Sequence, residues 1–217
     1  MRRLNHGYTN ATVGDDTKVI ETYAGPRAAL RAEREYTALA ALAGSLPVPA
    51  VLGRAPGTLT LAFVAGAHGQ ELIDAGYADR VLDACGSVLR KIHAAGFGHG
   101  DFGPNNTLLD PDSLEVTAVL DWEFSSAGRV DPVVDLAWCE WIVRMHHTGE
   151  AAAIPALYAG YGTSFPWRER QAPMVRRCAE LIEFTHELIE FTHEWEQGGP
   201  SEALWRERLD ATATWSE

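Results

Sequence analysis

The sequence is poor in cysteine and has no long apolar run. Its 217 residues include three cysteines, Cys85, Cys139 and Cys178. Their odd number and wide spacing exclude a metal knuckle or a redox pair and fit a reducing compartment. Polar residues follow the basic N-terminal residues 1–4 where a signal peptide would have its apolar core. No stretch approaches the length of a membrane span. We therefore expect a cytoplasmic protein with no membrane partner.

Positive charge is also scarce. The chain has 18 Lys and Arg against 30 Asp and Glu, which gives a formal net charge of -12. Such a chain repels a phosphate backbone, so we expect no nucleic-acid partner. A cationic small molecule would be attracted, although an acidic composition often serves only solubility. The hydrophobic fraction of 46% indicates a globular protein.

The order of predicted elements indicates an α+β fold with two lobes. Short strands are expected within 1–25, at 48–54 and at 58–64, with one helix at about 26–43. A loop at 66–69 leads to a helix at about 77–95, a loop at 99–106, and two short strands at 107–109 and 116–120. The chain from 131 onward is expected to be mostly helical. We therefore predict a small β-rich lobe over 1–65 and a larger helical lobe over 66–217, which touch because no Gly/Ser linker separates them.

One seven-residue unit occurs twice in succession. The letters LIEFTHE span 181–187 and again 188–194. Seven residues make two helical turns, so the two copies share a helix face. The apolar members are expected in the core. The glutamates form a second stripe, which is either a solvated face or a wall that collects a cationic acceptor, with Glu187, Glu190 and Glu194 as its candidate contacts.

The chemically informative residues begin in the loop at 99–106. Asp101 lies in a Gly/Pro loop between a helix and a strand, where loops present side chains to ligands. Asn106 follows five residues later at a strand start, and Asp121 ends the apolar strand 116–120. A carboxylate beside an amide offers the hard oxygens that Mg²⁺ prefers. A further carboxylate can then accept the proton of an attacking hydroxyl.

Three motifs in order resemble the aminoglycoside phosphotransferase family, which includes choline-, homoserine- and methylthioribose-kinase-like enzymes. They are His99-Gly100-Asp101 with Asn106, then Leu120-Asp121-Trp122-Glu123, then Asp131-Pro132 with Asp135-Leu136-Ala137. The resemblance spans roughly 5–165 and is strongest over 97–141. It implies a protein-kinase-like fold and ATP-dependent phosphoryl transfer to a hydroxyl.

The resemblance also implies a role for each matching residue. Asp101 would be the catalytic base, and Asn106 and Asp121 would bind Mg²⁺. His99 and Asp135 would brace the catalytic loop by hydrogen bonds. The tripeptide Asp101-Phe102-Gly103 spells the magnesium motif of protein kinases, but it falls here inside the catalytic loop.

The adenine of ATP would bind at the hinge between the lobes. The resemblance places this contact on backbone groups of Phe63, Val64 and Ala65. The loop that should cover the phosphates, residues 5–10, contains a single glycine, so its signal is weak.

The phosphate clamp of the family is where the sequence departs from the pattern. A strand lysine should pair with a helix glutamate, for which Glu35 is the candidate. The lysine position falls on Glu21, and the nearby lysine is Lys18. Because strand side chains alternate, these two should face opposite sides. Either the strand is shifted and Lys18 is the clamp, or the clamp is missing and Arg27 or Arg31 substitutes.

Two functions remain open from the sequence. The first is transfer of phosphate from MgATP to a hydroxyl of an aminoglycoside-like antibiotic or a metabolite alcohol, with Glu123 placed to reach the metal or the acceptor or to serve the structure. The second is a nucleotide-binding pseudoenzyme, which the missing lysine suggests. A protein kinase is disfavoured because no activation segment separates Asp121 from Asp131. The acceptor, the choice of ATP or GTP, and the oligomeric state are not encoded in any motif.

Overall fold

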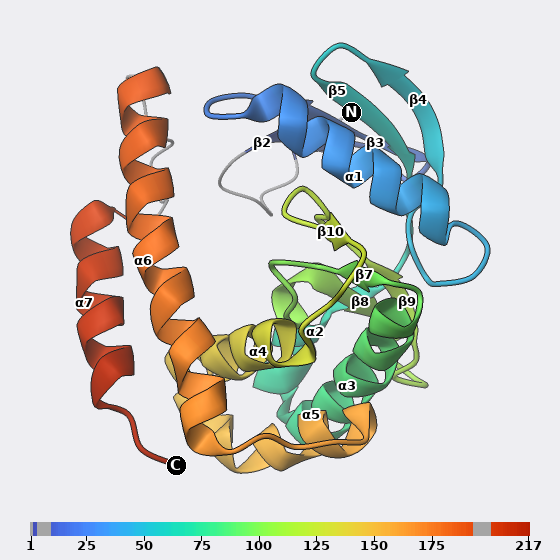
Figure 1. Cartoon of the computed structure of the whole chain (residues 1–217). Coiled ribbons are helices and arrows are strands. Elements are labelled where there is room, and N and C mark those ends of the chain that lie inside the picture. Colours follow the sequence, from blue (N-terminus) through green and yellow to red (C-terminus); the bar gives the residue numbers. More distant parts are fainter. Residues whose placement is uncertain (1, 4–9, 193–200) are drawn as a thin grey trace.

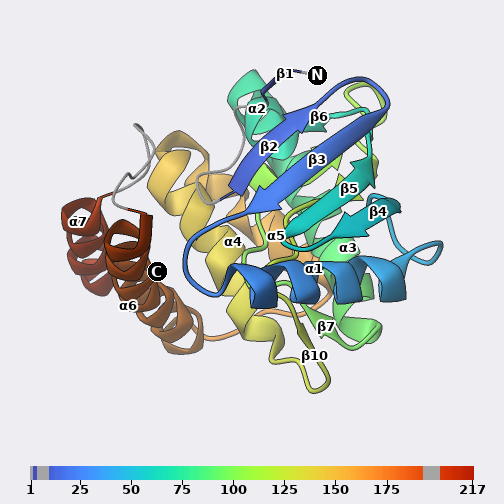
Figure 2. The same cartoon turned by 90° about the horizontal axis from the view of Figure 1, so that it is seen from above.

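The computed structural model describes residues 2–3, 10–192 and 201–217. The first part of the chain forms an antiparallel sheet of order β1-β2-β3-β5-β4. One helix, α1 (Ala28–Leu42), packs on it (Figures 1 and 2). The five strands are β1 (Arg2–Arg3), β2 (Asn10–Gly14), β3 (Lys18–Tyr23), β4 (Val51–Ala55) and β5 (Thr58–Ala62).

The rest of the chain is mainly helical; most of it lies below the sheet in Figure 1, and α6 (Trp167–Thr192) rises beside the sheet and α1. Its principal helices are α2 (Gly69–Leu72), α3 (Ala78–Ala94), α4 (Pro132–His146), α5 (Ile154–Tyr161), α6 (Trp167–Thr192) and α7 (Glu202–Thr214). A π-helical turn (Ile73–Tyr77) and two 3₁₀ turns (Pro104–Asn106 and Thr148–Ala153) connect them. Short strands complete this part: β6 (Ala67–His68), β7 (Phe97–Gly98), β8 (Thr107–Leu109), β9 (Val116–Val119) and β10 (Ser126–Ala127).

The predicted α+β, two-lobed arrangement is confirmed, although the short elements β6, β7, β10 and α2 were not predicted. Residues 66–69 were expected as a loop, yet β6 forms there by pairing Ala67 with Leu109 and His68 with Leu108. The partner strand is about forty positions away in the chain, so local residue preferences do not reveal this pairing.

A stack of indole rings joins α4, α6 and α7 into one unit. Trp138 and Trp141 of α4 are parallel, with ring centroids 4.4 Å apart, and Trp205 of α7 lies 5.7 Å from Trp141. Met174 and Cys178 of α6 fill the same cluster. Stacked aromatic rings contribute more than their buried area alone. This cluster therefore holds the α4 side chains in fixed positions against α6.

The repeated seven-residue unit forms part of α6, which rises beside the start of α1 in Figure 1. Phe184 is buried and Leu181 packs on the α4–α7 cluster, as expected for the apolar stripe. No helix in the described part of the chain is both long and apolar enough to cross a bilayer.

Two glycines allow α3 and α5 to pack backbone against backbone. A methyl group on Gly86 of α3 would stand 2.0 Å from the Leu157 carbonyl oxygen, and one on Gly160 of α5 would stand 2.1 Å from that of Asp83. Both distances are shorter than any real contact, so the spacing of these helices depends on the missing side chains.

We predict that Gly86→Ala lowers the free energy of unfolding by about 3 kcal/mol, because a methyl group forces two backbones apart. Urea denaturation measures the effect. Gly149→Ala is the matched control, since no atom lies within 4 Å of its new methyl group. An equal stability of both variants would contradict the packing described here.

Candidate active site

The carboxylate of Asp135 fixes the loop that precedes β8. Asp135 lies in the first turn of α4 and is buried. It accepts the backbone N–H groups of His99 at 2.9 Å and Gly100 at 2.8 Å, and the His93 ring at 3.0 Å. Burial alone would raise the pKa of Asp135, but the hydrogen bond from His93 and the neighbouring histidines outweigh it and lower that pKa. An ionised carboxylate therefore holds the loop.

His99 is fully buried under the same loop and is held in one orientation. Its Nε2 lies 2.9 Å from the Leu120 carbonyl oxygen, and its Nδ1 accepts the Asp101 backbone N–H at 3.2 Å. Its ring packs 4.6 Å from that of Trp122. Burial lowers the pKa of His99, so the neutral ring matches one donated and one accepted bond. The ring ties the loop to the strand end at Asp121.

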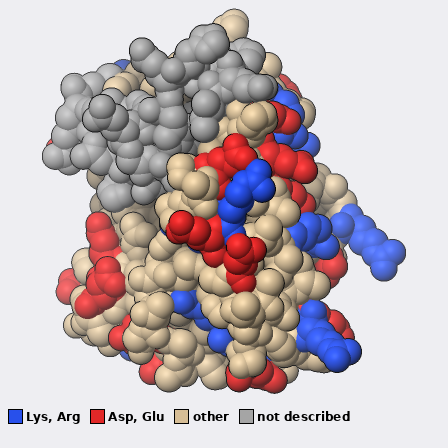
Figure 3. Space-filling view, turned by 90° about the vertical axis from the view of Figure 1, so that its left-hand side faces the viewer, with Lys and Arg blue, Asp and Glu red and all other residues tan. Residues whose placement is uncertain are grey.

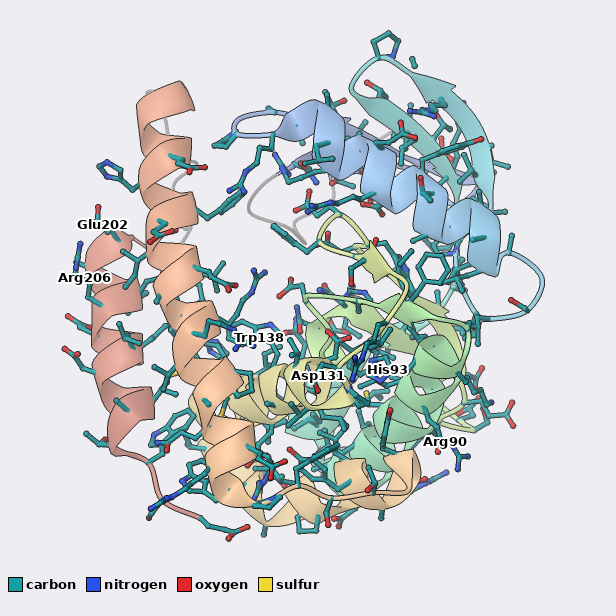
Figure 4. The ribbon with its side chains drawn as sticks, viewed as in Figure 1. Arg90, His93, Asp131, Trp138, Glu202 and Arg206 are labelled. Carbon is teal, nitrogen blue, oxygen red and sulfur yellow. The ribbon has the colours of Figure 1, made fainter. Side chains whose placement is uncertain are left out.

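Asp101 is held by two side-chain donors. Trp138 Nε1 donates to Oδ1 at 2.7 Å, and Asn106 Nδ2 donates to Oδ2 at 3.2 Å and to the Asp101 carbonyl oxygen at 2.9 Å. Trp138, which is labelled in Figure 4, lies one turn after Asp135 on α4. One helix face therefore braces the loop and orients its carboxylate. The sequence reasoning did not find Trp138, although the three-residue spacing from Asp135 was a signal.

Asp121 is half-buried, and its Oδ1 atom is shielded from solvent. Its Oδ1 has no hydrogen-bond partner in the described chain, and its backbone has a φ of 62°, a left-handed conformation that Asp tolerates better than most residues. Burial first, and then repulsion from Glu123 and Glu35, raise its pKa. An orphaned carboxyl oxygen of this kind fits a divalent cation.

The residues present also fit Mg²⁺ in their chemistry. Asn106 uses its Nδ2 on Asp101, which leaves its amide oxygen as the donor suited to a metal. The described chain has no group of three or more His, Cys, Asp and Glu side chains placed to hold a metal. One carboxylate with one amide is nevertheless the small ligand set that Mg²⁺ accepts when phosphates supply the rest.

An acidic cluster occupies the small lobe where a lysine was sought. Glu35 of α1 is buried and accepts the Tyr23 hydroxyl at 2.7 Å, and the same hydroxyl lies 3.1 Å from Glu21. Burial and the charge of Glu123 raise the pKa of Glu21 to about 7, and burial with the Glu21 charge raises that of Glu35. The Tyr23 hydroxyl has one hydrogen and can donate to only one of the two carboxyls. The other carboxyl must be protonated to donate to the hydroxyl oxygen.

The buried cation of this region is Arg31, one turn before Glu35 on α1. Its guanidinium is 2% exposed and pairs with Glu123. It also donates to the Asn10 side chain at 3.0 Å and to the Pro26 carbonyl oxygen at 3.1 Å. Asn10 donates in turn to Glu123 at 2.8 Å. An arginine of the small lobe thus pairs with the glutamate of the Asp121-Trp122-Glu123 motif. The sequence indicated Arg31 only as a substitute for the lysine that binds the phosphates.

The remaining predicted residues are not brought into this cluster. Lys18 begins β3 three positions before Glu21, so it faces away from Glu35. The hinge residues Phe63, Val64 and Ala65 lie between β5 and β6, where the Ala65 carbonyl oxygen accepts the Thr117 hydroxyl at 3.0 Å.

The three glutamates of the expected acidic wall have different outcomes. Glu187 forms an ion pair of 3.1 Å with Arg27 at the start of α1. The backbone of Glu190 belongs to α6. Glu194 lies outside the described residues, as do residues 5–9 of the expected phosphate loop.

Comparison with known proteins finds a family model that matches the part of the chain that carries this site. Residues 94–173 match the family model described as "Phosphotransferase enzyme family". A 40-residue stretch is 50% identical to acyl-CoA dehydrogenase family member 10 of Mus musculus, and it makes up 18% of this chain and 4% of that protein. The chain therefore matches only a small part of that relative.

Solved structures of aminoglycoside phosphotransferases share the fold across both lobes. The gentamicin complex of APH(2″)-IIa is 12% identical, with 98% of this chain and 89% of that chain covered at a TM-score of 0.65. A GDP complex of an aminoglycoside 2′-phosphotransferase-IIIa mutant is 12% identical, with 98% and 90% covered at 0.70. A putative aminoglycoside phosphotransferase of Ralstonia eutropha is 16% identical, with 100% and 93% covered at 0.63. The resemblance read from the motifs is confirmed.

We predict that Glu21→Gln raises stability at pH 8 and has a much smaller effect at pH 5. A carboxyl whose pKa is raised in the folded state destabilises the fold as pH rises from about 4.5 to about 7, where the charged form appears. The gain at pH 8 should be about 1–2 kcal/mol, because the half-buried side chain is partly screened.

Urea denaturation at the two pH values measures this difference. Glu207→Gln, which changes an exposed glutamate of α7, is the control and should alter stability equally little at both. A Glu21→Gln effect that is the same at pH 5 and pH 8 would contradict a titration near neutrality.

Proposed function

Because residues 94–173 match the phosphotransferase enzyme family and both lobes have the protein-kinase-like fold, we propose that the protein transfers the γ-phosphate of ATP to a hydroxyl of a small acceptor. The observation that carries the proposal is the Asp101 carboxylate, held by Trp138 and Asn106 on a loop anchored to Asp135. A module that only binds a nucleotide would gain nothing from a carboxylate held so firmly.

In the proposed reaction the acceptor oxygen forms a bond to the γ-phosphorus. The bond from that phosphorus to the β,γ-bridging oxygen breaks, the acceptor proton passes to Asp101, and ADP leaves. Asp101 has both oxygens oriented by donors, so little rearrangement is needed before the proton is taken.

Asp121 and Asn106 are the residues that would hold Mg²⁺. When bound, the ion neutralises charge on the phosphates. The unpartnered Oδ1 of Asp121 and the amide orientation of Asn106 support this assignment. The strand and loop that carry them are linked by the hydrogen bond from the Leu120 N–H to the Asn106 carbonyl oxygen at 2.8 Å, which keeps both ligands in one place.

The small lobe supports nucleotide binding without the family lysine. The chain has two lysines, Lys18 and Lys91. Lys18 lies on β3 but faces away from Glu35, and Lys91 lies on α3 in the helical lobe. The raised pKa values of Glu21 and Glu35 favour protonated carboxyls, which do not repel a phosphate. Arg31, which bridges to Glu123, supplies the positive charge in this region.

A nucleotide-binding module without transfer activity is the second candidate, and the glutamate at position 21 favours it. The two functions differ in one property. Both require that MgATP stabilise the protein against heat, but only the enzyme releases ADP at a rate that depends on Asp101.

We predict that Asp101→Asn lowers ATP turnover by at least a hundredfold, because the amide cannot accept the proton. The same variant should bind MgATP within about threefold of wild type, since this residue is assigned no ligand role. Coupled ADP-release assays and calorimetry measure the two quantities.

Asp112→Asn is the control, because it changes an exposed aspartate in the turn before β9. Turnover by Asp101→Asn equal to that of Asp112→Asn would remove Asp101 from the role of base.

A further inference from the structure

A cavity of about 410 Å³ lies beside the catalytic loop, between α1, α4 and α6. Gly100 lines it and precedes Asp101 in the chain. Trp138 lines it and donates to the Asp101 carboxylate. Phe124 lines it and follows Glu123. The cavity is therefore next to the proposed base and is large enough for a small acceptor.

The cavity is basic, although the chain as a whole is acidic. Five arginines line it against three glutamates, Glu180, Glu183 and Glu187. Because Arg31 is already paired with the buried Glu123, the lining has one positive charge in excess. The net charge of the chain is -12, so this lining has the opposite sign to the protein. The five are Arg27, Arg31, Arg34, Arg176 and Arg177.

Arg177 carries the clearest sign of a missing partner. Its Nε and Nη2 are buried and have no hydrogen-bond acceptor in the described chain. Its guanidinium lies 4.8 Å from the Phe124 ring centroid and 5.8 Å from that of Trp138, so aromatic faces hold it in place. Its Nη1 forms a long ion pair of 3.6 Å with Glu180, so the nitrogens that lack an acceptor are Nε and Nη2.

The glutamates of α6 offset this charge only in part. Glu180 is shared, since Arg176 lies 3.9 Å away and Arg177 lies 3.6 Å away. Glu187 is occupied by Arg27 across the gap between α6 and α1. On the outer face that carries α6 and α7, Figure 3 shows basic side chains among the acidic ones.

We propose that the acceptor is a small hydroxylated anion, with a carboxylate or phosphate group that binds at Arg176 and Arg177 while a hydroxyl reaches Asp101. The inference rests on the proposed function for the role of the hydroxyl. Arginine recognises planar and tetrahedral oxyanions through paired N–H groups, and the unpartnered nitrogens of Arg177 lack such acceptors. A cationic acceptor would meet an excess of positive charge in this cavity.

Four six-carbon polyols that differ in charge test the inference. Gluconate carries a carboxylate, sorbitol 6-phosphate a phosphate, sorbitol no charge, and glucamine an ammonium group. Calorimetric titration of the full chain in the presence of MgADP compares them without any turnover. We expect gluconate or sorbitol 6-phosphate to bind at least tenfold more tightly than sorbitol and glucamine, and the stronger of the two identifies the preferred anion.

Two charge reversals of similar exposed arginines locate the site. Arg176 and Arg206 are both more than half exposed and each pairs with a glutamate four positions away, Glu180 and Glu202. Arg206 is on α7, outside the cavity (Figure 4). Arg176→Glu should weaken binding of the anion at least tenfold, and Arg206→Glu should change it less than twofold. Both variants should bind MgADP as wild type does.

Three outcomes would overturn the inference: tighter binding of glucamine than of either anion, equal effects of the two reversals, or no binding of any probe to wild type. Anion binding that Arg176→Glu abolishes supports the site even where no phosphoester forms with MgATP. In that case the proposed phosphoryl transfer fails and the anion site stands.

Discussion

The geometry of the site depends on one buried carboxylate, that of Asp135. Three donors meet it, two from the loop backbone and one from His93. An anion away from water is stable only when its oxygens are satisfied in this way. Gly100 must adopt a φ of 82° there, and a side chain at this position would meet the Phe124 carbonyl oxygen at 2.4 Å. These contacts together fix the backbone conformation of the loop up to Asp101.

The same helix links this anchor to the acceptor side of the site. Asp135 and Trp138 are one turn apart on α4, and Trp138 is stacked into the indole cluster with α6 and α7. The loop, the base and the lining of the basic cavity are thus fixed by one element. A change in how α6 packs on α4 would move Trp138 and with it the donor to Asp101.

The small lobe distributes charge differently from the family pattern. The strand position that should hold a cation holds Glu21, and the cation instead comes from Arg31 on the helix. The two arrangements differ in how the positive charge is stabilised before the nucleotide binds. A lysine near phosphate is solvated until the nucleotide binds, whereas Arg31 is buried in a network with Glu123 and Asn10, where loss of one partner leaves an uncompensated charge.

The sequence was most informative where function constrains neighbouring residues. The functional residues of the loop at 99–106 and Asp121 follow one another at short spacing. Their order could therefore be recognised from the sequence, and with it the two-lobed fold. The contact of Arg31 could not be predicted, because its partner lies 92 positions away. Trp138 lies 37 positions from Asp101, and its spacing from Asp135 was the one local signal of its role. The glutamates of α6 were expected to form either a solvated face or a wall that collects a cationic acceptor, yet Glu187 pairs with Arg27, which is 160 positions away. Residue patterns reveal which charges exist, but long-range contacts decide which are neutralised.

Phosphoryl transfer from ATP to a hydroxyl is tested most directly by phosphorus NMR of the protein with ATP and a panel of hydroxylated acceptors, with and without Mg²⁺. We expect the γ-phosphate resonance of ATP to decline only when Mg²⁺ is present, while resonances of ADP and of the phosphomonoester of an acceptor appear. ATP that persists with every acceptor, although MgATP stabilises the protein against heat, would contradict it and identify a nucleotide-binding module.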